Sequence, residues 1–278
     1  MIDIPAIATN LRLGADGIWH SRAVRDVSFP HDAHDINLGV EDVSFWFRHR
    51  NACILSLIHE FPPPGGGPVF DIGGGNGFVS RAIADEGMDV VLVEPGLVGA
   101  RNAKARGIRT VVCASLDDVH FRPHSLAAAG VFDVIEHIED DLGFLKLLNG
   151  CLMNGGMVYA TVPAYSWLWS DEDKTAGHFR RYSIETLSTR FAAAGFRVRF
   201  ATYFFRPMPL PILLLRTLPS WLGLRNRNTG RAVREHGTSE GAIRRWTDRL
   251  LAPELHRIAS RRPIGFGGSC LIAAERAG

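Results

Sequence analysis

Short apolar runs alternate with amphipathic stretches along most of the chain from residue 68 onward. Apolar runs of strand length predict buried strands, and the stretches between them carry apolar residues at helical spacing. Apolar strands that alternate with helices indicate a mostly parallel sheet covered on both faces. The predicted strands are 68–74, 88–95, 108–114, 125–133, 155–163, 197–204 and 266–276, and the predicted helices are 76–87, 97–107, 138–152 and 183–196.

Two other segments interrupt this alternation. Residues 41–61 carry apolar positions at near-helical spacing and predict a helix, which ends at PPPGGGP (62–68) because a helix cannot cross that sequence. The second segment, residues 205–265, begins with an apolar, proline-rich stretch. The rest of it predicts a pair of amphipathic basic helices. The expected units are an N-terminal helical extension or cover at 1–67, an α/β core at 68–204, a helical cap or interface insertion at 205–265, and the last strand of the core at 266–278.

Charge and composition exclude several classes of protein. The 278 residues include 31 basic and 29 acidic side chains, which argues against a nucleic-acid partner held by a strong positive field. The 4 cysteines form no CxxC pair and are expected to be reduced core residues. We find no signal-peptide pattern and no apolar run of spanning length, so a cytoplasmic location is expected. His31, His34 and Asp35 lie close together, but we interpret them as part of a polar loop, and no metal site is predicted.

A glycine-rich sequence, VFDIGGGNGF, contains the end of the first of these strands and leads into a helix. Glycine allows backbone angles and close ligand contacts that other residues forbid, and a helix N-terminus offers free N–H groups. The spacing Gly73-x-Gly75-x-Gly77 differs from the GxGxxG of dinucleotide sites, and a P-loop is excluded because no GK[ST] follows. Asp71 would repel a pyrophosphate, so the loop suits a ligand with an amino group and no phosphate.

A second carboxylate, Glu94, ends the next predicted strand. A carboxylate at the tip of the second strand in such a fold can accept hydrogen bonds from both hydroxyls of a ribose. The alternative is an acidic residue in a solvent-exposed loop. The glycine loop nearby favours ribose binding over this alternative.

The motifs DIGGGNG, VVLVEPG, VFDVIEHIEDD and GGMVYATVPAY together resemble the class I S-adenosylmethionine-dependent methyltransferases of the type 11, 12 or 23 group. The resemblance covers residues 68–200, although Gly74 and Asn76 stand where Cys and Thr or Ser are commoner. It implies a Rossmann-like α/β fold with a seven-stranded, mostly parallel sheet, helices on both faces and an antiparallel last strand. It also implies S-adenosyl-L-methionine as cofactor, S-adenosyl-L-homocysteine as product, and methylation at O, N or C of a small-molecule acceptor, including lipid-linked or sugar-linked ones.

The resemblance also implies roles for residues at the strand ends. Asp71 and the Gly73 backbone would hold the amino acid end of the cofactor, and Glu94 would bind its ribose. His137 follows Glu136 at a loop-to-helix junction beside this site, as a candidate catalytic or positioning residue. The implied cofactor-binding residues are Asp71, Gly73, Gly75, Gly77 and Glu94, then Ser115 and Leu116 beside the adenine, and Phe132 and Asp133 beside the methionine moiety and the sulfonium.

The segment PAYSWLWSDEDKTAGHFRRYS at 163–183 is long for a plain connection and rich in polar and aromatic residues. We interpret it as a substrate lid, because ligands in open α/β sheets bind at the carboxyl ends of the strands. The alternative is a structural loop in which Arg and His cap the next helix and pair with Asp171 or Glu172. The candidate residues are His178 as base, Tyr182 as a second catalytic residue, and Arg181 and Trp167 as substrate-binding residues.

The predicted helix at 41–61 supplies two more candidate substrate-binding residues, Trp46 and Arg50. Aromatic residues of a helix folded over the cofactor could exclude water and face the sulfonium through cation–π contact. Core packing is the alternative for Trp46, and a plain surface position is the alternative for Arg50.

The apolar stretch at 205–225 is flanked by arginines and allows a peripheral membrane contact or a lipid-linked substrate. A buried cap or a homodimer interface is the favoured interpretation. Two other functions stay open for the whole chain. The sequence features disfavour both: Asp71 and the glycine spacing argue against a nicotinamide-dependent oxidoreductase, and the complete acid–glycine–acid set argues against a non-catalytic Rossmann-like binding protein.

Overall fold

The computed structural model describes residues 2–22, 38–39, 41–42, 44–224 and 242–277. His31, His34 and Asp35 lie outside these residues, as does position 225. The strands are β1 (Leu11–Leu13), β2 (Trp19–Ser21), β3 (Val69–Ile72), β4 (Val90–Val93), β5 (Thr110–Cys113), β6 (Leu126–Phe132), β7 (Leu152–Pro163), β8 (Phe196–Phe204) and β9 (Ser269–Arg276). The longer helices are α3 (Phe45–Glu60), α4 (Phe78–Asp85), α5 (Leu97–Ala105), α7 (Asp141–Cys151), α9 (Ile184–Ala193) and α13 (Ala242–Ala259). The shorter helices are α1 (Ile4–Ile7), η1 (Pro64–Gly66), α6 (Leu116–Val119), η2 (Ile135–His137), η3 (Ser166–Leu168), α8 (Asp171–Ala176), α10 (Pro209–Ile212), η4 (Leu213–Thr217) and α11 (Leu218–Trp221).

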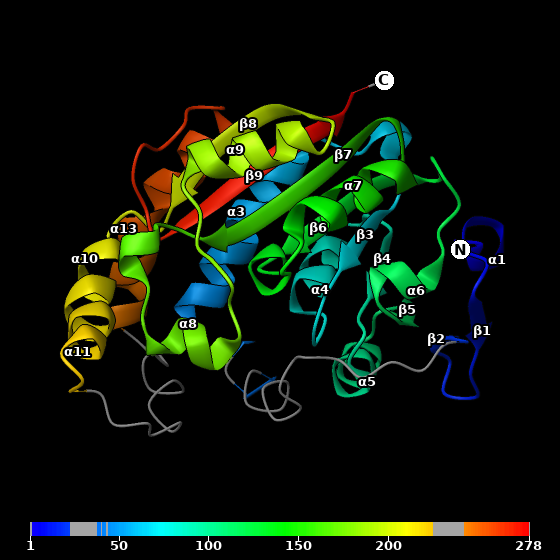
Figure 1. Cartoon of the computed structure of the whole chain (residues 1–278), viewed down its shortest axis with the longest axis horizontal. Coiled ribbons are helices and arrows are strands. Elements are labelled where there is room, and N and C mark those ends of the chain that lie inside the picture. Colours follow the sequence, from blue (N-terminus) through cyan, green and yellow to red (C-terminus); the bar gives the residue numbers. More distant parts are fainter. Residues whose placement is uncertain (1, 23–37, 40, 43, 225–241, 278) are drawn as a thin grey trace.

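The strands of the described residues form one sheet in the order β1-β2-β5-β4-β3-β6-β7-β9-β8 (Figure 1). Strands β5, β4, β3, β6 and β7 run parallel to one another. Strand β9 is antiparallel to β7, and β8 is antiparallel to β9. The predicted α/β architecture with an antiparallel last strand is therefore confirmed.

The sheet has nine strands instead of the expected seven. The two additional strands, β1 and β2, come from the N-terminal segment that we expected to be only a helical cover. Strand β2 pairs in parallel with β5 through Trp19 and Val112, and Ile18 beside it is buried in a small core cluster. Each additional strand has only 3 residues, which is too short for a recognisable alternation of apolar and polar positions.

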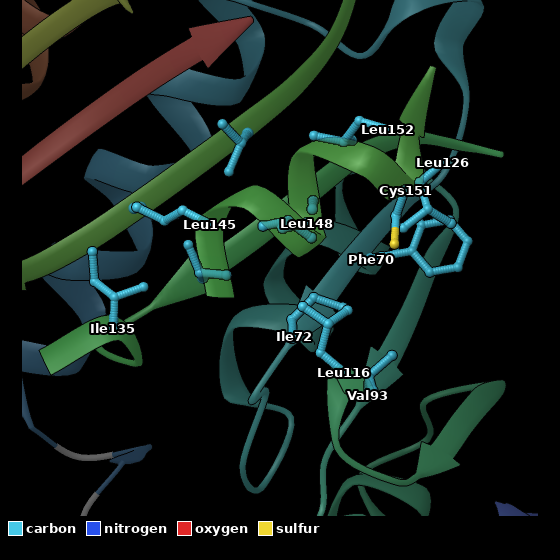
Figure 2. Close-up of a cluster of buried hydrophobic side chains, with 14 of the residues drawn as sticks. Phe70, Ile72, Val93, Leu116, Leu126, Ile135, Leu145, Leu148, Cys151 and Leu152 are labelled. Carbon is cyan, nitrogen blue, oxygen red and sulfur yellow. The ribbon is translucent and has the colours of Figure 1, made fainter. Parts of the chain in front are cut away.

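The central strands are buried on both faces, since every residue of β3, β4 and β6 is buried. Alternate side chains of a strand point to opposite faces. Phe70 and Ile72 therefore join the core cluster that α7 and α9 cover, while Val69 joins the cluster that α3 and α13 cover (Figure 1). Figure 2 shows Leu145 and Leu148 of α7 on the first of these faces.

Helices from the N-terminal and C-terminal parts of the chain cover one face of the sheet. Helix α3 begins after Ser44, whose hydroxyl accepts a hydrogen bond from the Trp46 N–H. It packs against α13, and His49 of α3 lies 2.9 Å from Glu254 of α13 between buried side chains. After β8, α10, η4 and α11 follow one another without a break. No helix within the described ranges is long and apolar enough to cross a membrane.

Candidate functional site

The glycine loop joins β3 to α4 at the carboxyl end of the central strand. Gly73, Gly75 and Gly77 have φ angles of +73°, +53° and +78°, a region that favours glycine. A Cβ atom on Gly73 would lie 2.7 Å from Cγ2 of Val134, so the loop approaches the end of β6 more closely than another residue would allow. Gly77 directly precedes α4, and the start of that helix offers backbone N–H groups at this end of the sheet.

Asp71 supports this loop from the interior of the protein. Its buried carboxylate accepts a 2.6 Å hydrogen bond from the Ser80 hydroxyl of α4. Burial raises the pKa of Asp71 to about 6. The structure therefore places Asp71 behind the loop, where it fixes α4 to β3. The predicted contact of Asp71 with the amino acid end of the cofactor stays a prediction.

Glu94 holds the loop from the end of β4. Its carboxylate accepts hydrogen bonds from the N–H groups of Gly75 at 2.9 Å and Gly96 at 2.7 Å. Burial raises the pKa of Glu94 to about 7 despite these two bonds.

A cavity of about 340 Å³ lies where β3, β4, β5 and β6 end, within the size range of small-molecule sites. Ser115 and Leu116, the residues expected beside an adenine, both line it, and so does Gly73. Ser115 also begins α6 and donates from its hydroxyl to Asp118 at 2.7 Å. Further lining side chains include those of Ile72, Val93, Pro95, Val134 and Phe144.

Phe132 and Asp133, both expected beside a sulfonium, face different surroundings. The Phe132 ring is buried in the core cluster under α3 and does not line the cavity, because alternation along β6 turns it to that face. Phe132 is therefore a packing residue. Asp133 has a φ of +56°, accepts a 2.9 Å hydrogen bond from the Thr161 hydroxyl, and forms an ion pair with Arg50 of α3. Arg50 thus joins α3 to the end of β6 and is no plain surface residue.

Trp46 packs in the interior and not over the cavity. Its ring stacks on Phe205 with centroids 3.8 Å apart and an interplanar angle of 12°. Phe205 is itself fully buried just after β8. Core packing, the alternative to substrate binding, therefore describes Trp46.

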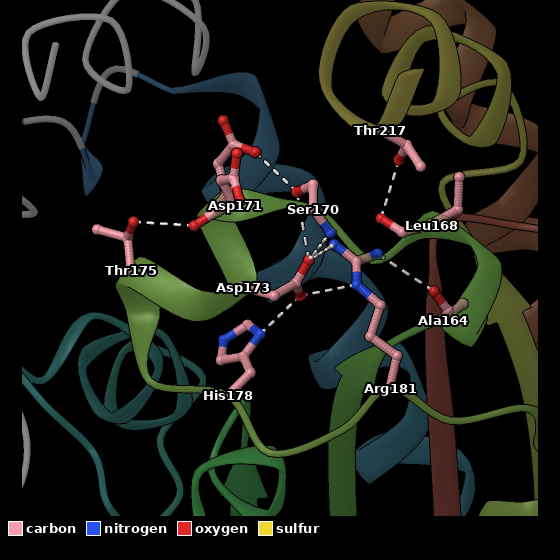
Figure 3. Close-up of polar contacts among 10 residues, drawn as sticks. Ala164, Leu168, Ser170, Asp171, Asp173, Thr175, His178, Arg181 and Thr217 are labelled. Atoms are coloured by element: carbon pink, nitrogen blue, oxygen red, sulfur yellow. Dashed lines mark hydrogen bonds and ion pairs between the residues drawn. The ribbon is translucent and has the colours of Figure 1, made fainter. Parts of the chain in front are cut away.

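Asp173 organises the segment 163–183 (Figure 3). Its carboxylate is 1% exposed and accepts hydrogen bonds from Arg181 at 2.7 and 3.0 Å and from the Ser170 N–H at 2.9 Å. Nδ1 of His178 lies 2.9 Å from the same carboxylate. Burial raises the pKa of Asp173, but the hydrogen bonds from His178 and Arg181 outweigh this effect and lower it to about 2.

The Arg181 guanidinium is therefore bound by groups of the protein itself. Its side chain is 8% exposed, and it also donates to the Ala164 carbonyl at 3.2 Å. A guanidinium held in this way cannot also serve as an open clamp for a substrate anion, so our expectation for Arg181 is corrected. Pairing with an acid of the same segment was the alternative, but the acid is Asp173 and not Asp171 or Glu172.

The other two candidates of this segment differ strongly in burial. Tyr182 is buried, and its hydroxyl donates to the Asp141 carboxylate at 2.8 Å. Burial and this bond raise the pKa of Tyr182, and the expected catalytic role becomes a structural one because a substrate cannot reach the hydroxyl. Trp167 is 41% exposed and stacks on Tyr165 with ring centroids 5.3 Å apart.

Glu136, His137 and His178 come together beside Asp133. The two imidazole rings lie 4.6 Å apart at an interplanar angle of 83°. The Phe179 N–H donates to the Glu136 carbonyl at 2.8 Å and holds the segment after α8 against η2. Burial, with Asp133 close by, raises the pKa of Glu136. Burial and the neighbouring His178 lower the pKa of His137 to about 4, which keeps its imidazole neutral at pH 7.

Sequence reasoning placed Glu136, His137 and His178 near one site, but it gave Glu136 no role and missed Asp173 as the carboxylate that holds His178. The signal for Glu136 is its position directly before His137 and just after a buried strand. The sequence holds no comparable signal for Asp173, because Asp171 and Glu172 lie at similar distances along the chain from His178 and Arg181.

Comparison with known proteins identifies the family. A family model described as a methyltransferase domain matches residues 46–199. The chain belongs to this methyltransferase family. The sequence-based prediction of an S-adenosylmethionine-dependent methyltransferase is thereby confirmed. No curated protein matches the sequence.

Solved structures share the fold of this methyltransferase at low sequence identity. A chain from the complex of the Haloferax volcanii Trm112 methyltransferase activator with a methyltransferase is 17% identical, with a TM-score of 0.59 over 91% of this chain and 100% of that one. Phosphoethanolamine N-methyltransferase 2 of Haemonchus contortus, in complex with S-adenosyl-L-methionine, is 18% identical, with a TM-score of 0.55 over 93% of this chain and 61% of that one. A SAM-dependent methyltransferase of Archaeoglobus fulgidus is 18% identical, with a TM-score of 0.52 over 81% of this chain and 92% of that one.

Proposed function

We propose that the cavity at the strand ends binds S-adenosylmethionine and that the chain transfers its methyl group to an O, N or C atom of a small molecule. The observation that carries this proposal is the convergence of the glycine loop, Glu94 and the cavity at the carboxyl ends of β3, β4 and β5. Ligands of open α/β sheets bind at such a point. The proposed cofactor-binding unit is 68–204 with 266–278, and the proposed covers are 1–67 and 205–265.

The residues around the cavity fit the parts of this cofactor. Pro95 and Leu116 offer apolar walls for an adenine. We expect Glu94, which lies between the lining residues Val93 and Pro95, to accept hydrogen bonds from ribose hydroxyls. The Gly73 backbone, which leaves no room for a Cβ, allows a close approach of the amino acid end.

The acceptor is proposed to bind beside Asp133, under the segment 163–183. The cofactor supplies an electrophilic methyl group, so the protein must align the acceptor with it and exclude water. The ion pair of Arg50 with Asp133 brings α3 to this point, and the network around Asp173 holds His178 there. His137 and His178 are therefore the histidines that an acceptor would meet.

Calorimetry with S-adenosylhomocysteine tests the proposed function. We expect one binding site per chain with a dissociation constant on the order of micromolar, and no binding of NAD. Binding of NAD but not of S-adenosylhomocysteine would turn the assignment toward an oxidoreductase. Binding of neither would favour a non-catalytic protein.

The affinity for S-adenosylhomocysteine is expected to fall as the pH is lowered through 7. The ionised form of Glu94 accepts ribose hydroxyls, and its pKa is raised to about 7 by burial, with Asp71 adding a smaller effect of the same sign. Above pH 7 the Glu94 carboxylate is mostly ionised and can accept the ribose hydroxyls directly. Below pH 7 it is mostly protonated, and its proton must be lost before the ligand binds. We expect about 10-fold weaker binding at pH 6 than at pH 8.

Glu94→Gln is the control for this pH dependence. The variant cannot ionise, so its affinity should be lower at pH 8 and nearly constant between pH 6 and 8. A wild-type affinity that stays constant over the same range would remove Glu94 from the ribose site.

We also propose that the cap contacts a lipid surface. Several large apolar side chains of α10, η4, α11 and the residues just after them are exposed on one stretch of chain: Leu210, Leu214, Leu215, Trp221, Leu222 and Leu224. Apolar residues with a tryptophan and nearby arginines are typical of helices that lie in a membrane interface.

The variant Leu215→Glu with Leu222→Glu is expected to reduce binding to vesicles of phosphatidylcholine and phosphatidylglycerol by about 10-fold or more. Each of these exposed leucines would contribute about 1.5–3 kcal/mol on entering the apolar part of the membrane. Flotation of the vesicles measures the bound fraction. Leu13→Glu is the matched control, since Leu13 is an exposed leucine of β1 far along the sheet from the cap. No flotation of the wild type, with a change of molecular mass in the double variant, would identify a homodimer interface instead.

A further inference from the structure

Glu136, His137 and His178 offer three metal-ligating atoms at one point of the fold. One carboxylate oxygen and one ring nitrogen from each histidine all lie within 4.8 Å of one another. In a tetrahedral site Zn²⁺ holds nitrogen and oxygen ligands at about 2.0–2.2 Å, which places two ligand atoms about 3.3–3.6 Å apart. The three side chains would therefore close in around an ion, starting from atoms that already lie within 4.8 Å of one another.

The Glu136 carboxylate provides independent support for a ligand here. Its side chain is buried, and Oε2 has no hydrogen-bond partner among the residues that the structure describes. A buried carboxylate oxygen without a partner loses its hydration and gains nothing in return. Arg50 and Arg181 lower the pKa of Glu136 slightly, but each of them is ion-paired with another carboxylate. A cation at this point would supply the missing partner.

His178 is held as a metal-binding histidine commonly is. Its Nδ1 lies 2.9 Å from the Asp173 carboxylate (Figure 3), which leaves Nε2 as the nitrogen that can bind an ion. Histidine ligands usually have such a carboxylate on their other ring nitrogen, which fixes the ring and its tautomer. The hydrogen bond from the Phe179 N–H to the Glu136 carbonyl fixes the distance between the two parts of the site.

A second group of possible ligands, His49, Cys53 and Glu254, is explained without an ion. Nε2 of His49 lies 2.9 Å from the Glu254 carboxylate and 3.4 Å from the Cys53 sulfur. The Glu254 carboxylate also accepts hydrogen bonds from the N–H groups of Phe205 at 2.8 Å and Arg206 at 2.7 Å. Glu254 thus has partners on both oxygens, in contrast to Glu136.

We propose that Glu136, His137 and His178 form a binding site for a divalent transition-metal ion of the Zn²⁺ class, and that this ion binds an oxygen atom of the methyl acceptor. Two histidines and one carboxylate are a ligand set that leaves positions open for a substrate. The inference rests on the proposed function, because it places the ion beside the oxygen atom of the acceptor that receives the methyl group. It also departs from the sequence analysis, which predicted no metal site.

A cation at this point would make an acceptor hydroxyl more acidic. The hydroxyl proton leaves to solvent, and the oxygen electron pair forms the new C–O bond. The C–S bond of the cofactor breaks at the same time, and its electron pair stays on the sulfur of S-adenosylhomocysteine. The acceptor class that this site favours is therefore an alcohol or phenol.

The test is calorimetric titration of the full-length, chelator-treated protein with Zn²⁺, repeated with Co²⁺ and read by visible absorption. We expect one equivalent of metal to bind to the wild type, and Glu136→Gln and His178→Ala to weaken binding by about 100-fold or more. Glu136→Gln keeps the shape of the side chain, and thermal melting of both variants shows whether they fold. His59→Ala is the matched control, because His59 is an exposed histidine on α3 and should leave metal binding unchanged.

Titration of the same proteins with S-adenosylhomocysteine separates the possible outcomes. The metal site would be overturned if the wild type, Glu136→Gln and His178→Ala bound metal with equal affinity. If these proteins still bound S-adenosylhomocysteine, the proposed function would stand. Loss of metal binding in His59→Ala as well would show that the metal binds to surface histidines only, which also overturns the site. A wild type that binds metal as expected but no S-adenosylhomocysteine would instead contradict the proposed function.

Discussion

Replacing Asp173 by alanine is expected to lower the free energy of unfolding by about 3–5 kcal/mol, because it breaks a buried ion pair from one side. The Arg181 guanidinium would lose two hydrogen bonds and remain buried as an unpaired charge. The Ser170 N–H and the His178 ring would lose their shared partner as well. Urea denaturation followed by circular dichroism measures the change.

Asp171→Ala is the matched control in the same short helix. Asp171 forms an ion pair with Lys174 at 2.9 Å, but both side chains are largely exposed, so its loss should cost less than about 1 kcal/mol. An equal loss of stability in Asp171→Ala and Asp173→Ala would show that Asp173 does not organise the segment. Asp173→Asn keeps the shape without the charge and should fall between the two.

The central sheet was predictable because its strands carry their own signal. Strands β3 and β6 are buried along their whole length, so the apolar runs VFDI and LAAAGVF stand out in the sequence. The glycine loop was predictable for a similar reason, since positive φ angles and a close approach to Val134 admit few other residues. Strands β1 and β2 have no such signal. Each has only three residues, and pairing with the rest of the sheet, not an alternation of apolar and polar positions, makes them strands.

Partners of polar side chains could not be predicted in the same way. Three consecutive acids, at 171–173, all lie within reach of Arg181 along the chain, and only the packing of α8 decides that Asp173 is the buried one. Tyr182 has a polar tip like many catalytic tyrosines, but its partner Asp141 belongs to a helix 41 residues earlier. Such choices depend on tertiary contacts, which sequence spacing does not record.

The orientation of β6 decides the roles of two neighbouring residues for the same reason. Phe132 and Asp133 are adjacent, and a sequence motif assigns both to one site. The pleat of the strand turns the Phe132 ring toward α3, whereas the backbone at Asp133 turns its carboxylate toward Arg50 and Thr161. Arg50 consequently connects α3 to the point where the acceptor is proposed to bind.

Gly73→Ala is expected to weaken binding of S-adenosylhomocysteine by about 100-fold, which corresponds to about 2.7 kcal/mol. The new Cβ would lie 2.7 Å from Val134, and both residues line the cavity, so the loop or the end of β6 must move. The positive φ of Gly73 adds strain of about 1–2 kcal/mol for any other residue. Calorimetry at pH 8 measures the affinity, and thermal melting measures the stability of the same sample.

Gly66→Ala separates the strain from the collision. Gly66 also has a positive φ, at +64°, but a Cβ there would meet no atom within 4 Å, and the residue lies outside the cavity lining. It should therefore lose stability through strain while binding S-adenosylhomocysteine as the wild type does. If Gly73→Ala folded and bound with wild-type affinity, the space between Gly73 and Val134 would not be part of the cofactor site. Weak binding by Gly73→Ala alone would instead place the cofactor against the backbone of this loop, because strain without the collision leaves binding intact.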